Sequence, residues 1–129
     1  MIYLLDTNTC IRYLNGTSER IRRHIVAEGD TKIALCSVVK AELYFGVKKS
    51  ARQSANLESL LHFVHRFSSY PFDDAAGERY GDIRCVLEKG GTPIGLNDLM
   101  IAAIALTHGL VLITHNTGEF RRVPGLNVV

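Results

Sequence analysis

Four consecutive apolar residues, 2–5, followed at once by Asp6-Thr7-Asn8, are the feature that most constrains how this chain folds. An uninterrupted apolar run of this length is typical of a strand buried on both faces, in the middle of a parallel sheet. Thr7 and Asn8 are able to turn the chain and cap a helix over residues 11–14. Because ligands of open α/β sheets bind beyond the carboxyl ends of the strands, we interpret Asp6 as the first member of an active site.

Short apolar runs and helical patterns alternate along the rest of the chain. Further strands are predicted at residues 33–36, 70–72, 110–113 and 126–129. Pro71 favours an edge position for the strand at 70–72, because proline cannot donate to a neighbouring strand. A helix is predicted to follow the cap Asn97 and to end near residue 108. This alternation predicts a single domain, 1–129, of the α/β/α class with a mostly parallel sheet of four to five strands.

The composition narrows the class of protein. With 15 basic and 13 acidic residues, the formal net charge is +2, too small by itself to indicate a polyanionic partner, so any nucleic-acid surface is a local patch. Cys10, Cys36 and Cys85 lack metal-ligand or redox spacing and are interpreted as buried thiols of a cytoplasmic protein. No segment approaches the ~20 apolar residues of a membrane-spanning helix, and we expect no membrane partner.

Two further carboxylates fall where an unpaired charge is costly. Glu42 lies on the inward-leaning side of a predicted helix, and Asp98 stands in the first turn of a helix whose residues 99–106 are apolar without a break. Each has an ordinary structural explanation when taken singly. Asp98 is then a first-turn acid favoured by the helix dipole, and Glu42 a surface partner of Lys40 or Lys49.

The three acids Asp6, Glu42 and Asp98 each follow a strand or loop that is expected to end at the same edge of the sheet. Converging carboxylates repel one another unless a cation neutralises them. Hard divalent cations such as Mg²⁺ or Mn²⁺ choose oxygen ligands of this kind. The pattern therefore predicts a divalent metal site at this edge.

Four stretches of the sequence, in order along the whole chain, are similar to one family. They are Leu5-Asp6-Thr7-Asn8, residues 37–46 (SVVKAELYFG), residues 93–103 (PIGLNDLMIAA) and residues 114–120 (THNTGEF), the last followed by Pro124-Gly125-Leu126. With these motifs the chain resembles a PIN-domain ribonuclease, and specifically a VapC-type toxin of a type II toxin–antitoxin system.

The resemblance implies a Rossmann-like fold and a Mg²⁺- or Mn²⁺-dependent endoribonuclease that cuts structured RNA, often tRNA. It also implies inhibition by a cognate VapB-type antitoxin, and a homodimer. Asp6, Glu42 and Asp98 fall on the acidic metal-site positions of the family. The mechanistic hypothesis is in-line attack on a phosphodiester by a water whose pKa the metal lowers.

The sequence departs from the family pattern at one place. Many PIN domains have a fourth acid shortly after the last core strand, where this chain has Asn116, whose amide brings no charge. Glu119 is the candidate for the missing carboxylate and is predicted to be catalytic. Thr7, Asn8 and Asn116 are predicted to orient waters or a carboxylate, although Thr7 and Asn8 are equally well explained as helix caps.

Basic side chains near the acids are the candidate RNA contacts. Arg121 and Arg122 lie close in sequence to Glu119, and Arg84 is the next candidate, although most charge clusters are simply solvated surface. Leu57, Leu61 and Val64 form a helical stripe that is most simply core. The apolar surface of this stripe that the core does not need, together with Phe63, is a candidate groove for an antitoxin helix or a dimer.

Two alternatives from other classes stay open at this point. A haloacid-dehalogenase-like phosphatase would use Asp6 as its nucleophile, but it requires a second acid at the place of Asn8 and a late lysine. The other alternative is a non-catalytic module whose acids bind a structural metal ion.

Overall fold

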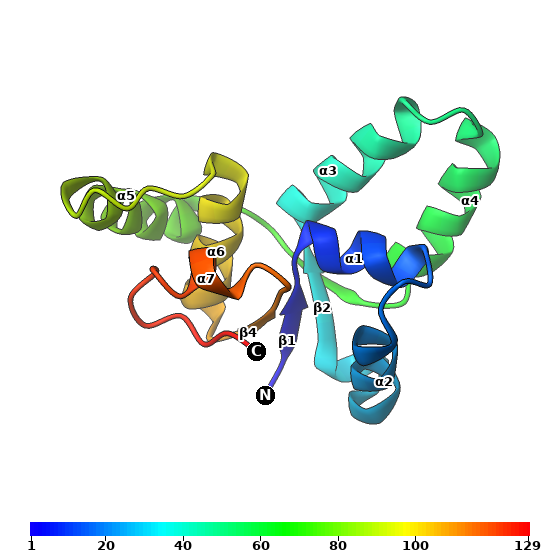
Figure 1. Ribbon diagram of the computed structural model, residues 1–129, viewed down its shortest axis with the longest axis horizontal. Helices are drawn as coiled ribbons and strands as arrows, with labels where there is room; N and C mark the ends of the chain where they lie inside the picture. The colour runs from blue at the N-terminus through cyan, green and yellow to red at the C-terminus, as the bar shows by residue number, and fades with distance from the viewer.

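The computed structural model describes residues 1–129, and its centre is a four-stranded sheet whose strands all run parallel (Figure 1). The strands are β1 (Tyr3–Leu5), β2 (Ile33–Cys36), β3 (Ser68–Tyr70) and β4 (Val111–Ile113). Their order in the sheet is β3-β2-β1-β4, so the strand predicted to be central lies between two neighbours. The chain crosses from β1 to β2 and β3 in one direction, and β4 is then added on the other side of β1.

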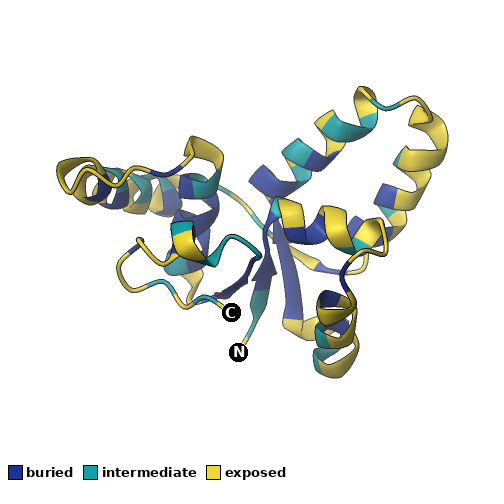
Figure 2. Cartoon of the chain, in the orientation of Figure 1, coloured by how far each residue is buried: buried dark blue, intermediate teal, exposed yellow.

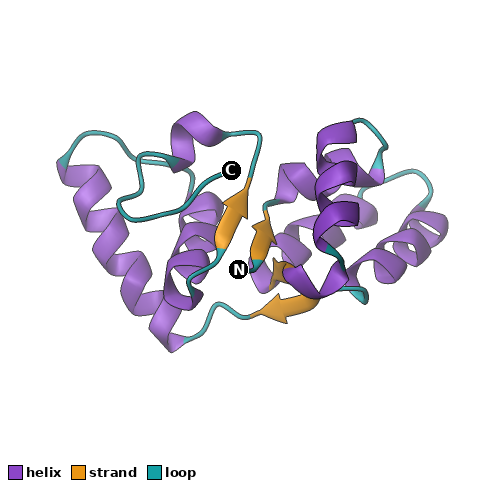
Figure 3. Cartoon of the chain, turned by 90° about the horizontal axis from the view of Figure 1, so that it is seen from below, coloured by secondary structure: helices purple, strands orange, loops and turns teal.

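Seven α-helices and one short 3-10 helix surround the sheet. The helices are α1 (Thr7–Leu14), α2 (Glu19–Glu28), η1 (Asp30–Lys32), α3 (Ser37–Lys48), α4 (Gln53–Val64), α5 (Asp74–Lys89), α6 (Leu96–His108) and α7 (Thr117–Phe120). In Figure 1, α1 to α4 lie to the right of β1, and α5 to α7 lie to its left. Figure 3 shows the same two groups of helices from below, with the strands between them. This arrangement confirms the predicted α/β/α class.

The core follows the sheet and the helix faces that touch it (Figure 2). Every residue of β2 and β4 is buried, whereas β3 is mostly exposed. Helix α6 is buried from Ile101 through Ala105, as its continuous apolar run predicts. Each large aliphatic side chain removed from water in this way stabilises the fold by roughly 1.5–3 kcal/mol.

The two edges of the sheet differ from the sequence prediction in detail. The strand predicted at 70–72 ends at Tyr70, so Pro71 lies just beyond it; its predicted edge position is confirmed. The predicted fifth strand is reduced to one bridge between Leu112 and Val128. The amide of Leu112 donates to the carbonyl of Asn127 at 2.8 Å, so the C-terminal segment still satisfies the edge of β4.

Two helix starts were also assigned wrongly. Helix α1 begins at Thr7, and its cap is Asp6 rather than Thr7 or Asn8. Helix α6 begins at Leu96 with Gly95 in the cap position, so Asn97 lies inside the helix and Asp98 is its third residue. Both shifts keep the acids in place: Asp6 stays at the strand end, and Asp98 stays in the first helical turn.

The cysteine prediction is correct for two of the three residues. All three are free, with Cys10 and Cys36 buried and Cys85 exposed on α5. Burial raises the pKa of both buried thiols, which are therefore protonated and poor nucleophiles at neutral pH. None of the helices combines the length and the apolarity that a crossing of the bilayer requires.

Candidate active site

The strand order reverses between β1 and β4, and ligands of open α/β sheets bind at such a switch point. Asp6 is placed there as the residue directly after β1, with a side chain only 3% exposed. Its Oδ1 accepts the backbone N–H of Thr9 at 2.9 Å, which caps α1. Its Oδ2 accepts the hydroxyl of Thr114, the residue directly after β4, at 2.5 Å. The carboxylate is thus fixed from both strands while each oxygen keeps a free lone pair.

Glu42 reaches the same place from α3. It is half-buried, and its Oε1 accepts the hydroxyl of Thr7 at 2.5 Å. No ion pair joins it to Lys40 or Lys49, so the surface-pair explanation of Glu42 is wrong. Thr7 therefore orients a site carboxylate, as predicted, and it does so from the first turn of α1.

Asp98 has the most perturbed carboxyl group of the site. Its side chain accepts no hydrogen bond and forms no ion pair. Burial is the main cause that raises its pKa to about 6, and the negative charges of Glu119, Asp6 and Glu42 act in the same direction. This coupling shows that the acids from α6, α7, β1 and α3 lie within electrostatic reach of one another.

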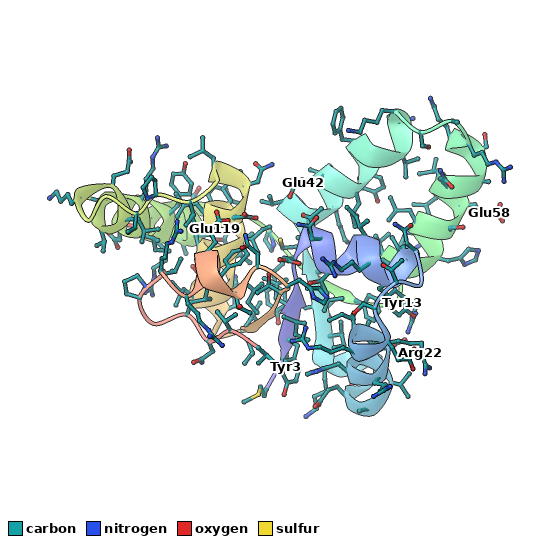
Figure 4. All side chains as sticks on the ribbon, viewed as in Figure 1. Tyr3, Tyr13, Arg22, Glu42, Glu58 and Glu119 are labelled. Carbon is teal, nitrogen blue, oxygen red and sulfur yellow. The ribbon has the colours of Figure 1, made fainter.

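Glu119, on α7, lies near Asp98, and its carboxylate accepts hydrogen bonds from two donors. Its Oε1 accepts the backbone N–H of Gly95 at 3.0 Å, and its Oε2 accepts the side-chain amide of Asn116 at 2.5 Å. Asn116 lines the cleft, whereas Glu119 lies behind it. Asn116 thus occupies the position of the family's missing acid, and its amide is hydrogen-bonded to Glu119, the candidate replacement. Figure 4 labels Glu42 above the carboxyl end of β1 and Glu119 to the left of it.

These residues surround a cleft of about 890 Å³. Its lining includes Asp6, Thr7, Asn8, Glu42, Asp98 and Asn116, so six of the predicted site residues line one cavity. Every ion pair of the structure lies elsewhere, and none of the site acids is neutralised by an arginine or a lysine. Buried carboxylates without a counter-charge are costly unless a cation binds them.

The donor set fits a hard divalent cation, with one qualification from the geometry. No three His, Cys, Asp or Glu side chains form a closed group around a single point. Mg²⁺ commonly binds through only one or two carboxylates and completes its shell with water and substrate phosphate. The oxygen donors of Asp6 and Asp98 are suited to that open mode of binding.

The predicted RNA contacts lie outside the cleft lining. Arg121 and Arg122 are exposed at the end of α7, where Arg122 donates to the carbonyl of Pro93 at 3.1 Å. Arg84 is paired with Glu88 on α5. Lys49 is the only lysine or arginine that lines the cleft, and we predicted no site role for it from the sequence.

Two other residues of the site were also missed. Thr114 holds Asp6, and Phe45 lines the cleft one helical turn beyond Glu42. The spacing of Glu42, Phe45 and Lys49, at i, i+3 and i+7, places them on one face of α3 and is a signal that could have identified the last two.

The comparisons with known proteins agree with this geometry. The PIN domain family matches residues 3–126. Ribonuclease VapC2 of Rickettsia felis is 38% identical over 98% of this chain and 95% of its own length. The tRNA(fMet)-specific endonuclease VapC of Salmonella typhimurium is 36% identical over 98% of this chain and 95% of its own length.

Solved structures give the same result. The DNA-bound VapBC structure from Salmonella typhimurium matches with a TM-score of 0.94 at 35% identity, covering 100% of this chain and 97% of that chain. VapBC2 from Rickettsia felis, bound to a DNA fragment from the promoter, matches with a TM-score of 0.91 at 37% identity, covering 100% and 98%. By its sequence and its fold, the chain belongs to the PIN-domain family and to the VapC branch of it.

Proposed function

We propose that this protein is a metal-dependent endoribonuclease toxin that cleaves RNA by attack of water on a phosphodiester. The observation that carries the proposal is the cleft at the ends of β1 and β4, which Asp6, Glu42 and Asp98 all line and where none of them is paired with an arginine or a lysine. The relatives named ribonuclease and tRNA(fMet)-specific endonuclease support the same activity.

Asp6 and Asp98 are the residues that would bind Mg²⁺ or Mn²⁺, with Glu42 acting through a water. A divalent ion at this position supplies Lewis-acid stabilisation of the phosphate charge and lowers the pKa of an attacking water. The chain contributes the orientation of its ligands. Thr9 and Thr114 fix the two oxygens of Asp6, and Thr7 fixes Glu42.

Glu119 supplies the fourth negative charge of the proposed site. Its carboxylate is linked to the cleft through the amide of Asn116, and it raises the proton affinity of Asp98. At neutral pH the metal-free site therefore holds carboxylates that repel one another, and a divalent cation relieves this repulsion. That relief is what favours a cation at this place.

Transfer RNA is the proposed substrate. The Salmonella typhimurium relative is named for the initiator tRNA, tRNA(fMet), which makes that molecule the first one to test. Single-stranded loops of a folded RNA present unstacked bases and accessible phosphodiesters, which an open cleft is able to reach.

The deciding experiment incubates the purified protein with tRNA in Mn²⁺, in Mg²⁺ and in EDTA. We expect cleavage with either metal and none in EDTA, and a loss of at least about 100-fold in Asp6→Asn and Asp98→Asn, because each removes a charged metal ligand. Asp82→Asn, at an exposed acid of α5 outside the cleft, is the matched control and should cleave normally.

Three results would contradict the proposal in different ways. Undiminished cleavage by Asp6→Asn or Asp98→Asn would remove the assigned site. A covalent phosphoryl–enzyme adduct would favour the phosphatase alternative. RNA that stays intact under all metal conditions would favour the non-catalytic metal-binding module.

The proposed regulator is a VapB-type antitoxin, and the structure offers a groove for it. Beside the cleft, a second hollow of about 370 Å³ lies between α1, α3 and α4. Its apolar lining consists of Ile11, Leu14, Leu43, Val47 and Leu60. A hollow with such a lining suits the apolar face of an amphipathic helix. Helix α4 contributes Leu60 to this lining. Val64 is buried in the core, as the simpler explanation of its stripe predicts, and Phe63, the candidate for the groove, is buried there too.

Leu14→Arg tests this assignment because Leu14 is 39% exposed and lines the groove but not the cleft. We expect the variant to lose its complex with a co-expressed antitoxin while it keeps its ribonuclease activity. Val26→Arg, at an exposed position of α2 outside both hollows, should keep the complex.

Light scattering of the intact complex measures whether it contains the two copies of this chain that the family resemblance implies.

A further inference from the structure

The wall of the cleft that α3 provides carries an aromatic side chain with no structural role in the core. Phe45 is 64% exposed, compared with 37% for the neighbouring Tyr44. It lines the same cavity as Asp6 and Asp98. Its neighbour Tyr44 lines neither the cleft nor the adjoining groove. An exposed aromatic ring in the wall of a cleft that also contains carboxylates is of the kind that lines ligand sites.

Lys49 stands next to this ring. Its ammonium group lies 4.9 Å from the centroid of Phe45, within the range of a cation–π contact. Lys49 is also the only lysine or arginine that lines the cleft, which it shares with Asp6, Glu42 and Asp98. A polyanion that enters this acidic cavity therefore meets one positive charge, and that charge is held beside an aromatic face.

The approach to the ring is open. Gly46 lies between Phe45 and Lys49 on α3, and a Cβ built at Gly46 would meet nothing within 4 Å. Along the helix axis, Phe45 stands about 4.5 Å from Glu42. Phe45 and Glu42 therefore lie on neighbouring turns of α3 and line the same cavity, so a nucleotide bound at the carboxylates has the ring beside it.

We propose that Phe45 and Lys49 form a subsite for single-stranded RNA. The base next to the scissile phosphate stacks on Phe45, and the adjoining phosphate binds Lys49. This inference rests on the proposed ribonuclease function and adds to it the form of the substrate. Bases in a duplex are already stacked on each other, so only an unpaired nucleotide can place its base on the ring.

Binding of a fluorescently labelled single-stranded oligoribonucleotide, followed by anisotropy in EDTA so that the RNA stays intact, tests the stacking. We expect Phe45→Leu to weaken binding about tenfold, because it removes the π-face and keeps apolar bulk. Phe45→Tyr restores the ring and should bind within about twofold of the wild type. Tyr44→Leu removes an aromatic ring one residue away, outside the cleft, and should have no effect.

The salt dependence of the same binding tests the phosphate contact. Each phosphate neutralised on a single strand contributes about 0.7 to the slope of log affinity against log salt. Lys49→Gln should lower the slope by about that amount, and Lys49→Arg should keep it. Lys48→Gln removes a neighbouring lysine that does not line the cleft and should leave the slope unchanged.

Cleavage in Mn²⁺ completes the test. We expect Phe45→Leu to raise KM about tenfold with kcat nearly unchanged, and to leave the binding of a duplex of the same sequence unaffected.

If the wild type cleaves RNA and Phe45→Leu binds and cleaves like it, the subsite is wrong and the ribonuclease proposal stands. If the wild type cleaves no RNA, the ribonuclease proposal itself fails. If Phe45→Leu disrupts a complex with the antitoxin or a second copy but leaves RNA affinity intact, the ring belongs to a protein interface and the subsite is overturned.

Discussion

Thr114 and Asp6, 108 positions apart in the sequence, are joined by a hydrogen bond of 2.5 Å from the threonine hydroxyl to Oδ2 of the aspartate. Both residues are almost fully buried, at 1% and 3% exposure. The bond crosses from β4 to β1 at the point where the strand order reverses. It fixes the side chain on which the proposed metal site most depends.

Thr114→Val should expose this dependence. Valine keeps the shape of threonine but leaves Oδ2 of the buried Asp6 without its donor, which costs about 1–3 kcal/mol in unfolding free energy. We expect RNA cleavage to fall about 10- to 100-fold, as is usual when a group that orients a metal ligand is lost. Thr114→Ser retains the hydroxyl and should stay close to the wild type in both cleavage and stability; equal losses in the two variants would contradict the role of the hydroxyl.

Asp98 makes the stability of the metal-free protein depend on pH. Its pKa is raised in the folded state to about 6, so the folded state holds the proton more tightly than the unfolded state. The stability it contributes is therefore present at acidic pH and is lost as the pH rises toward and through 6. In EDTA at pH 7.5, Asp98→Asn should be more stable than the wild type by about 1 kcal/mol, after allowance for solvent screening of the half-buried group.

Thermal denaturation at pH 4.5 and at pH 7.5 measures this effect. The advantage of Asp98→Asn should shrink at pH 4.5, where the aspartate is already protonated, and Mn²⁺ at pH 7.5 should stabilise only the wild type. Glu119→Gln should give a part of the gain, because Glu119 is the neighbouring charge with the largest effect on Asp98. A wild type that is more stable than Asp98→Asn at pH 7.5 in EDTA would contradict the electrostatic account of the site.

Two glycines provide a matched pair of backbone substitutions. Gly46 lies inside α3 in helical conformation with open space around its Cβ position, whereas Gly109 ends α6 with a φ of +64°. Gly46→Ala should stabilise the protein by about 0.5–1 kcal/mol, because alanine loses less backbone entropy in a helix. Gly109→Ala should destabilise it by about 1–2 kcal/mol, because a side chain disfavours positive φ. Denaturant titration of both variants checks the opposite signs.

The thiols should differ sharply in reactivity. Cys85 is exposed, whereas Cys10 and Cys36 are buried and their pKa values are raised. A thiol reagent added to the native protein at pH 8 should therefore label a single site, Cys85, and all three sites in denaturant. Cys85→Ser should abolish the native labelling. Rapid labelling of Cys10 or Cys36 in the native protein would show that the core opens near Asp6.

The sequence predicts those parts of the site that depend on short stretches of chain. Asp6 was found because four apolar residues precede it directly, and Asp98 because an unbroken apolar helix follows it. Both features reflect burial of a single element, which leaves a periodic signal in the sequence. The parallel sheet was predictable for the same reason, and the edge position of the third strand followed from Pro71, which cannot donate to a neighbouring strand.

Contacts between distant segments were not predictable. Gly95 rather than Asn97 caps α6, and its backbone N–H is bonded by Glu119, 24 positions away. Thr114 gave no sign of its role because its partner is at the other end of the chain. Lys49 and Lys48 are equally basic, and only the helical spacing of Lys49 from Glu42 and Phe45 distinguishes it as the lysine that lines the cleft.

The placement of the cleft between the first and the last strand of the sheet also determines when it can exist. Asp6 leaves the ribosome more than 100 residues before β4 and Thr114. A nascent chain that has not yet released residues 111–114 has no complete site, however much of the rest has folded. The proposed cleavage of RNA is thereby confined to molecules in which β4 has been synthesised and has paired with β1.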